Sequence, residues 1–115
     1  MSLRDDILSF DDLESKVIKI KEWNNTKIKV KSLSAEKRYN LINSCMTGDK
    51  VDTMKLYVHT AIACAFDPET EEQIFTTNDF DLLKTKASSA IEKIITVANE
   101  LNGIGEGEIK VAEKN

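Results

Sequence analysis

A small α+β domain is the fold class that this 115-residue sequence predicts, with an N-terminal β-hairpin packed on about three α-helices of which the last is long. Residues 16–31 alternate between apolar residues and lysines, which is the period of a half-buried strand. Three later segments repeat apolar residues every three or four positions, which is the period of amphipathic helices. We therefore expect an acidic arm or short helix at 1–15, one domain at 16–103 and a mobile polar tail at 104–115.

The hairpin has one apolar face, and its members are Ile18, Ile20, Ile28 and Val30. A two-residue loop would place Ile20 opposite Lys29 and would mix the two faces. A three-residue loop at 23–25 keeps them apart, because it pairs Ile20 with Ile28 and Ile18 with Val30. We predict this longer loop, with Asn25 in the left-handed conformation that closes it.

Two helices are predicted after the hairpin. The first begins at Ser34, which is typical of an N-cap, and ends at 47–49. The second covers 51–66 and is apolar nearly all round from residue 56 onwards, so we expect it to be the most buried one. Pro68 stops it. Ile74 and Phe75 are then expected to enter the core before the last helix.

The last helix is predicted from Asp79 to Asn102, with Thr76 as its N-cap and Gly103 at its end. Its apolar residues fall in one arc of roughly 160°. They are Leu83, Ala87, Ala90, Ile91, Ile94, Ile95, Val97, Ala98 and Leu101. A hairpin and two shorter helices must cover this arc, so part of it is expected to remain for a partner.

Composition narrows the class of protein. A hydrophobic fraction of 41% and a charged fraction of 31% are typical of a soluble globular domain. No apolar run approaches the about 20 residues that cross a bilayer, and the acidic N-terminus does not resemble a signal peptide. We expect a cytoplasmic protein without membrane contact, and the net charge of −4 makes nucleic acid an unlikely partner.

Residues that could perform chemistry are few and scattered. His59 has no nucleophile or carboxylate at helical spacing beside it, which favours a structural role. Cys45 and Cys64 lie in apolar contexts, so we expect buried reduced thiols, with a disulfide as the alternative. The acidic clusters lack the glycine-centred spacing of a calcium loop. We therefore expect no enzyme, no metal and no cofactor.

The lysine face of the hairpin is the one unusual surface. The predicted register sets Lys19 opposite Lys29 and Lys21 opposite Lys27, and like charges in such pairs are destabilising. These lysines could be a solvated edge that discourages aggregation. They could also bind an acidic protein or RNA, with Trp23 adding an aromatic contact at the tip. We take these five residues as candidate partner-binding residues.

Short motifs along the chain follow one order. They are Ile18-Lys19-Ile20-Lys21-Glu22-Trp23, Ile28-Lys29-Val30, Leu33-Ser34-Ala35-Glu36-Lys37-Arg38, Ala65-Phe66-Asp67-Pro68-Glu69-Thr70, Ile74-Phe75-Thr76 and Leu101-Asn102-Gly103. In this order they resemble the tail assembly chaperones of long-tailed bacteriophages and prophages. Two positions depart from that pattern, since Lys21 stands where a proline often precedes Glu-Trp and Asn24 stands where a glycine often follows the tryptophan.

The resemblance implies a non-enzymatic protein. Such chaperones bind the tape-measure protein, keep this long helical chain soluble and help tail-tube subunits to polymerise around it. They act in the host cytoplasm and are absent from the mature virion. Many of their genes also make a longer product by frameshifting, whose added segment would here follow the tail after Gly103. A homo-oligomer is compatible with the sequence.

An intracellular adaptor or regulatory domain is the alternative function. Its basic hairpin face would bind an acidic protein or RNA, and such binding would weaken with salt. Gene context separates the two functions, because the chaperone requires a tail-tube gene upstream and a very long reading frame downstream.

Overall fold

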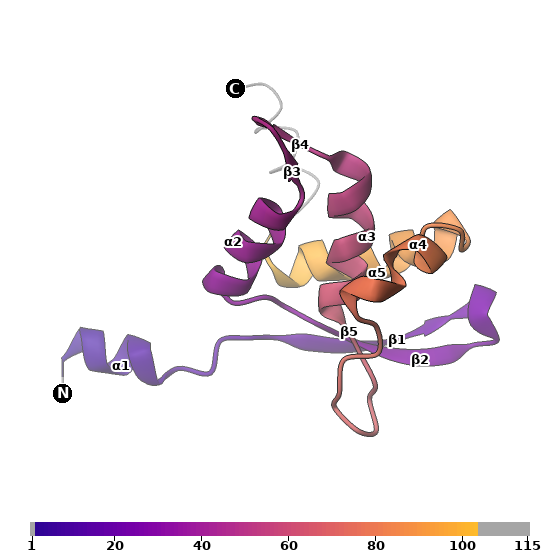
Figure 1. Ribbon diagram of the computed structural model, residues 1–115. Helices are drawn as coiled ribbons and strands as arrows, with labels where there is room; N and C mark the ends of the chain where they lie inside the picture. The colour runs from indigo at the N-terminus through magenta and orange to yellow at the C-terminus, as the bar shows by residue number, and fades with distance from the viewer. Residues whose placement is uncertain (1, 104–115) are drawn as a thin grey trace.

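The computed structural model describes residues 2–103, and the predicted tail at 104–115 lies outside them. The chain is α+β, as predicted, with a β-hairpin followed by helices (Figure 1). Its elements in order are α1 (Leu3–Ser9), β1 (Ser15–Ile20), the 3-10 turn η1 (Lys21–Trp23), β2 (Thr26–Lys31), α2 (Ala35–Ser44), β3 (Met46–Thr47), β4 (Lys50–Val51), α3 (Thr53–Cys64), β5 (Ala65–Phe66), the 3-10 turn η2 (Thr77–Asp79), α4 (Phe80–Leu83) and α5 (Ser88–Leu101).

The hairpin belongs to a three-stranded antiparallel sheet with the order β1-β2-β5. The strand β5 was not predicted, because residues 65 and 66 continue the apolar spacing of the helix before them. They leave that helix to pair with β2, where Phe66 lies opposite Lys29 and Ala65 opposite Val30. This third strand attaches the end of α3 to the hairpin.

The predicted register of the hairpin is wrong by two residues. Ile18 pairs with Ile28, and Ile20 pairs with Thr26 rather than with Ile28. The reason is η1, which occupies the first three positions after β1 and makes the loop five residues long. Asn25 is left-handed as predicted, and Asn24 is left-handed too, with φ values of 57° and 58°. Because the shift is an even number, the apolar face stays on one side.

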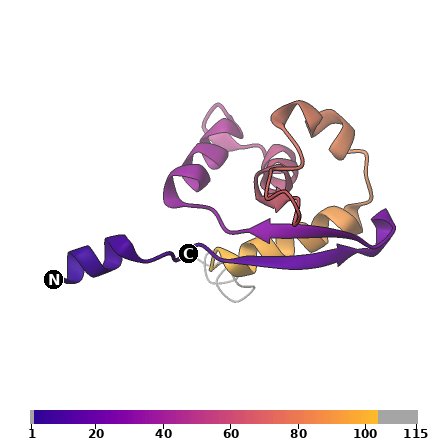
Figure 2. The same ribbon diagram turned by 90° about the horizontal axis from the view of Figure 1, so that it is seen from below.

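The core lies between the sheet, α3 and α5. Figure 2 shows α5 running alongside the two long strands, with α3 on the other side of the hairpin from the viewer. The side chains that fill this space are buried, and they include Ile20, Ile28 and Val30 from the sheet, Val58, Ala61 and Ile62 from α3, and Ile91, Ile94 and Ala98 from α5. The second predicted helix is thus central, although α3 is shorter than expected at both ends.

The predicted helix from 79 to 102 is broken into η2, α4 and α5. Thr76 caps η2 in a capping box with Asp79, and Gly103 follows α5 with φ of 77°, as predicted. The break comes after α4, where the Thr85 hydroxyl donates to the Leu82 carbonyl at 2.6 Å and Ala87, with φ of −57° and ψ of 127°, leaves the helical conformation. A threonine that bonds its own backbone in this way competes with helix. The break lets α4 cover α3 while α5 follows the sheet.

The apolar arc is covered within the chain. Its positions on α5 are buried at Ala90, Ile91, Ile94, Ile95 and Ala98. Val97 and Leu101 are half-buried and pack against the same core. Leu83 is also buried, but it lies on α4. The expectation that part of this arc is left for a partner is therefore wrong, apart from Ala87, which is exposed at the break.

The start of α2 was predicted correctly from its N-cap residue. The Ser34 hydroxyl accepts from the Lys37 amide, as an N-cap does. The helix ends earlier than predicted, at Ser44, because residues 46–51 form the small hairpin of β3 and β4. Asp52 then caps α3, accepting from the Lys55 amide. Cys45 beside this hairpin and Cys64 at the end of α3 are buried free thiols, as predicted.

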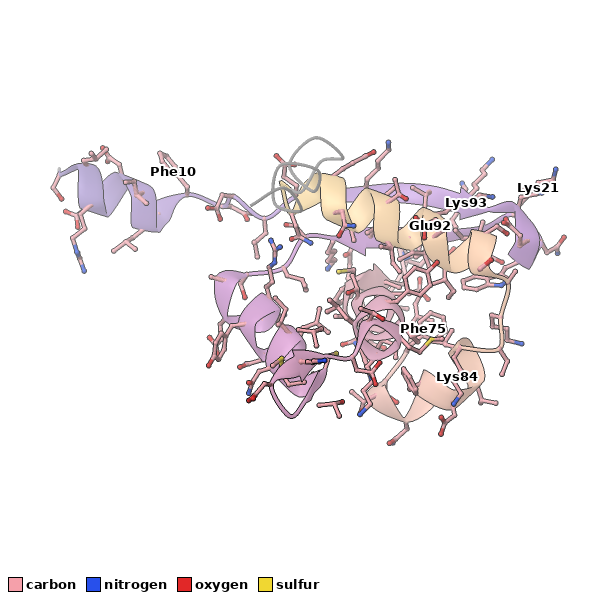
Figure 3. All side chains as sticks on the ribbon, turned by 90° about the horizontal axis from the view of Figure 1, so that it is seen from above. Phe10, Lys21, Phe75, Lys84, Glu92 and Lys93 are labelled. Carbon is pink, nitrogen blue, oxygen red and sulfur yellow. The ribbon has the colours of Figure 1, made fainter. Side chains whose placement is uncertain are left out.

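The first helix stands apart from the rest of the described chain. Figures 1 and 2 both show α1 projecting from the domain, joined to it by an extended segment. No residue of α1 is buried. Figure 3 shows Phe10 on this projection, whereas Phe75 lies within the body of the domain.

Candidate functional site

The outer face of the sheet carries the predicted lysines. We define the basic face as Lys19, Lys27, Lys29, Lys31 and Phe66. These residues alternate with the buried positions of β1, β2 and β5, so they point away from the core. Lys19 lies directly opposite Lys27, and neither has an ion-pair partner in residues 2–103. Two unpaired positive charges thus share this face near the hairpin tip.

At the other end of the basic face, two lysines share one carboxylate. Glu71 accepts from Lys29 at 2.8 Å and lies 3.2 Å from the Lys31 ammonium. The Lys29 and Lys31 ammonium groups lower the pKa of Glu71. Lys31 also lies over the Phe66 ring, with 4.4 Å between its nitrogen and the ring centroid.

A loop holds Glu71 in this place. Glu71 has φ of 65°, and its amide donates to the Asp67 carbonyl at 2.8 Å. The Asp67 amide in turn donates to the Glu72 carbonyl at 2.8 Å. These bonds close residues 67–72 into a compact turn below the sheet (Figure 1). Glu71 was not among the predicted site residues, because nothing in the local sequence indicates which strand the turn returns to.

The hairpin tip places Trp23 differently from the prediction. Its side chain is half-buried and packs against the core, with the Phe75 ring edge-on at 6.4 Å between centroids. Trp23 therefore stabilises the tip as well as offering part of its surface. Lys21 lies in η1, outside the strand, and does not face Lys27 as predicted; it points outwards at the tip (Figure 3).

Glu22 fixes the tip to α5. Its carboxylate accepts from the Lys93 ammonium at 2.6 Å. This hydrogen bond is the largest of the causes that lower the pKa of Glu22 from its ordinary value of 4.5 to about 2, and hydrogen bonds from Ser89 and from the Glu22 backbone add to it. Figure 3 shows Lys93 and Glu92 on α5 beside the hairpin. The tip is thus attached to α5 by one ion pair and to Phe75, in the segment before η2, by one aromatic contact.

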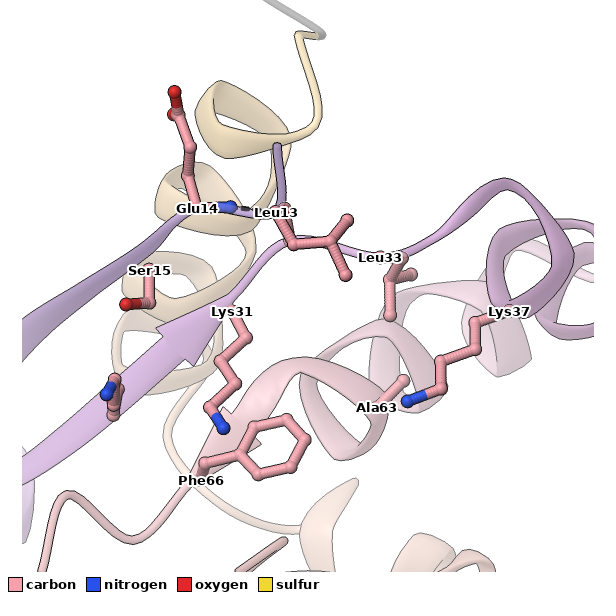
Figure 4. A pocket seen from close by; sticks show the side chains of 10 residues that line it. Leu13, Glu14, Ser15, Lys31, Leu33, Lys37, Ala63 and Phe66 are labelled. Carbon is pink, nitrogen blue, oxygen red and sulfur yellow. Dashed lines mark hydrogen bonds between the residues drawn. The ribbon is translucent and has the colours of Figure 1, made fainter. Parts of the chain in front are cut away.

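A groove that the sequence did not predict adjoins the basic face. It consists of two neighbouring hollows of about 350 and 370 Å³ that share Leu33, Lys37, Ala63 and Phe66 in their walls. Lys29 and Lys31 line the first hollow, and Ile62 and His59 line the second. Figure 4 shows Lys31 above Phe66 on one side, with Leu33 and Lys37 on the other. We call this the lysine-rimmed groove.

The titratable groups in and near the groove take part in packing and hydrogen bonding. His59 stacks on Phe80 with 4.8 Å between ring centroids, and burial lowers its pKa, assisted by the nearby Lys55 charge. On the other side of α3, Tyr57 donates to Glu92 at 2.8 Å, and burial followed by that hydrogen bond raises its pKa to about 12. No group of three potential metal-ligating side chains occurs in residues 2–103.

Within residues 2–103, none of the helices is both long enough and apolar enough to cross a bilayer.

Comparisons with known proteins add one finding. No protein-family model matches the sequence, and no curated protein matches it. Among solved structures, the bacteriophage HK97 tail assembly chaperone matches with a TM-score of 0.54 at 16% sequence identity. The fold is similar to that of a phage tail assembly chaperone. The match covers 88% of this chain and 95% of the HK97 chain, so it includes the hairpin and the helices together. At this identity the likeness concerns the fold.

Proposed function

We propose that this chain is a phage tail assembly chaperone. It binds the tape-measure protein, keeps that protein soluble and assists the assembly of the tail tube around it. It acts in the bacterial cytoplasm, without enzymatic activity, and does not remain in the virion. The likeness of its fold to the HK97 chaperone over nearly the whole chain carries this proposal.

The sequence supports the same function independently. The motifs from Ile18 to Gly103 resemble those of tail assembly chaperones in their order along the chain. In the fold they are structural: the Trp23 ring packs on Phe75, Ser34 caps α2 and Gly103 ends α5. Proteins that share a fold but differ widely in sequence would retain suitable residues at such positions, because these residues determine the turns and the core.

The surface of the domain suits the binding of a chain rather than of a small substrate. The described part has a shallow groove next to a basic face, and its perturbed titratable groups serve packing or ion pairs. Helical partners dock in such grooves through their apolar faces. We propose that the partner-binding surface contains Trp23, Lys19, Lys21, Lys27 and Lys29.

Co-expression tests the function. We expect the tape-measure protein of the same phage to be insoluble alone and to become soluble and co-purify when this chain is present. If its solubility does not change and no complex forms, the proposed function is wrong.

Charge reversal tests the surface. The double variant Lys19→Glu and Lys27→Glu removes the two unpaired charges of the basic face, and we expect it to lose most of the tape-measure protein in co-purification. The matched control is Lys50→Glu with Lys86→Glu, which changes two exposed lysines elsewhere. Trp23→Ala is less informative, because it also removes the contact with Phe75. Equal binding by the two double variants would place the binding surface elsewhere.

An adaptor that binds an acidic protein or RNA is the second function that an observation favours. That observation is the pair of unpaired cations, Lys19 opposite Lys27. For this function, binding to an acidic polypeptide or RNA should fall steeply with salt and should not require the tape-measure protein. The same double variant serves for this measurement.

A further inference from the structure

Glu71 lies beside the lysine-rimmed groove in a backbone conformation that is unfavourable for it. Its φ of 65° belongs to the left-handed region, which residues with a Cβ rarely adopt. Among residues 2–103, every other residue in this region is an asparagine or a glycine, and these two tolerate it best. A conformation of this kind persists only where its surroundings hold it, and it is characteristic of functional sites.

Two lysines of the groove hold the Glu71 carboxylate. It accepts from the Lys29 ammonium at 2.8 Å and lies 3.2 Å from the Lys31 ammonium. Both lysines line the first hollow, whereas Glu71 lines neither hollow, so it reaches them from outside the groove. The Glu71 side chain is 49% exposed. An ion pair that is open to water contributes little to stability, so a second carboxylate can replace Glu71 at small cost.

The opposite side of the groove has positive charge that no carboxylate balances. Lys37 on α2 lines both hollows, and it forms no ion pair within residues 2–103. Glu14 lines the first hollow as well, but Figure 4 shows its carboxylate directed away from Lys31. In the described part of the chain, the three lysines of the groove are thus paired with one carboxylate, that of Glu71. The groove therefore favours a partner that brings further carboxylates.

The floor between these lysines is apolar and belongs to two helices. Leu41 comes from α2, and Ile62 and Ala63 come from α3. Leu33, Leu41 and Ala63 are half-buried, so part of their surface is open to a partner. A hollow between two helices accommodates a third helix, whose apolar residues at every third or fourth position enter it. Carboxylates that flank such an apolar stripe would then lie next to the lysines.

We propose that the lysine-rimmed groove binds an acidic amphipathic helix of the tape-measure protein, and that Glu71 competes with the carboxylates of that helix for Lys29 and Lys31. In the free chain Glu71 occupies these two lysines. In the complex the carboxylates of the helix take its place, and others pair with Lys37 on the opposite side.

Glu71 thereby selects among the segments of the partner. A segment without carboxylates leaves Glu71 in place and gains only the apolar contact with the floor of the groove. An acidic segment also gains the ammonium groups of Lys29 and Lys31, which Glu71 gives up at small cost. This inference rests on the proposed function, to which it adds the chemistry of the bound segment and a residue that selects for it.

Peptide binding tests the chemistry of the bound segment. Overlapping fluorescein-labelled peptides that cover the tape-measure protein of the same phage are mixed with the full chain, and fluorescence anisotropy measures their binding. We expect binding to be confined to peptides that combine an apolar stripe with flanking aspartates or glutamates, and to weaken as salt is added. Replacing these acidic residues by their amides should reduce the affinity of a bound peptide by about tenfold or more.

Variants of the chain test the groove and the role of Glu71. Lys37→Glu should lose most of the binding of the acidic peptides. Glu71→Gln removes the competing charge, so we expect it to bind these peptides about threefold to tenfold more tightly. Glu71→Gly removes the same charge and suits the φ of 65°, so it should show a gain even where the glutamine variant is less stable. The matched control is Glu72→Gln, which makes the same change of net charge at an exposed neighbour that forms no ion pair within residues 2–103.

Three outcomes would overturn the proposal. Peptide binding that is absent, or that does not depend on carboxylates, would exclude an acidic segment as the occupant. Binding that Lys37→Glu leaves intact would exclude the groove. Affinities that are equal in the wild type, Glu71→Gln and Glu71→Gly, or an equal gain in Glu72→Gln, would exclude competition by Glu71. Co-expression separates these failures from failure of the proposed function, because a tape-measure protein that still becomes soluble would leave that function in place.

Discussion

The two helices at the ends of the described chain, α1 and α5, have the same kind of apolar spacing but differ in whether their apolar residues are buried. On α5 the stripe is buried at five positions between the sheet and α3. On α1 no residue is buried at all. The spacing indicates which side chains share a face of the helix. Whether other residues pack over that face depends on the rest of the chain. For α5 the cover is this domain, whereas residues 2–103 supply no cover for α1.

The largest expected difference between the two helices is the loss of stability when an isoleucine is replaced by alanine. Ile94 is 0% exposed in the centre of the core, so Ile94→Ala should lower the free energy of unfolding by about 3 kcal/mol. Ile7→Ala on α1 should change it by less than about 0.5 kcal/mol. Urea unfolding at low protein concentration measures both values. An equal loss in the two variants would mean that α1 packs on its own domain.

A hydrogen bond at the end of α5 should give the next largest effect. The Asn102 side-chain oxygen accepts from the partly buried Leu33 amide at 2.7 Å. Asn102→Ala leaves this amide without its partner, so we expect a loss of about 1.5 kcal/mol in the free energy of unfolding. Asn102→Asp keeps an acceptor and is the control for side-chain size. A loss in the alanine variant no greater than in the aspartate variant would contradict this role.

Two serine caps allow a matched comparison. Ser34 caps α2 and Ser2 caps α1, each by accepting from the amide three residues later. Ser34→Ala should cost about 1 kcal/mol of global stability, because α2 packs on α3. Ser2→Ala should leave the global transition where it is and reduce only the helical signal in circular dichroism. A shift of the unfolding midpoint in Ser2→Ala would show that α1 unfolds together with the domain.

The smallest effect is present near neutral pH and is lost in acid. The pKa of Glu22 is lowered from 4.5 to about 2, chiefly by the Lys93 hydrogen bond and further by Ser89 and the backbone. The ionised Glu22 therefore stabilises the fold above pH 4.5, and this contribution disappears as the pH falls towards 2. Glu22→Gln should therefore be less stable near neutral pH and should approach the wild-type curve in acid.

Thermal unfolding measured from pH 7 to pH 2 tests this convergence. Lys93→Gln breaks the same pair from the other side and should remove part of the acid dependence, because Glu22 keeps its hydrogen bonds with Ser89 and the backbone. Wild-type and variant curves that stay parallel over the whole range would rule out a contribution from this pair.

Features that depend on neighbours in the sequence were predicted correctly. The caps at Ser34 and Thr76, the left-handed Asn25 and the end of α5 at Gly103 all follow from side chains that bond or relax the local backbone. The α+β class follows from the change of period after residue 31.

Features that depend on contacts between residues far apart in the sequence were not predicted. The hairpin register shifted because η1 turns Trp23 towards Phe75, some fifty positions later in the chain. The strand β5 exists because β2 offers it an edge, and the long helix broke where α4 and α5 pack on different neighbours. The lysines of the basic face were predicted from their alternation with apolar residues. Glu71, which pairs with two of them, could not be predicted, because nothing in residues 67–72 indicates where the turn returns.

A further hollow of about 500 Å³ lies beside Asp12. It is lined by Asp12 and Leu13 where the arm leaves the sheet and by Leu101 and Asn102 at the end of α5, so both ends of the packed chain lie at one corner. A short linker from Gly103 to Leu13 would close the chain into a loop. New ends could then be opened in the exposed turn between Gly48 and Asp49. Such a circular permutant should keep the same sheet and core, because these depend on which surfaces meet and not on the order in which the chain visits them.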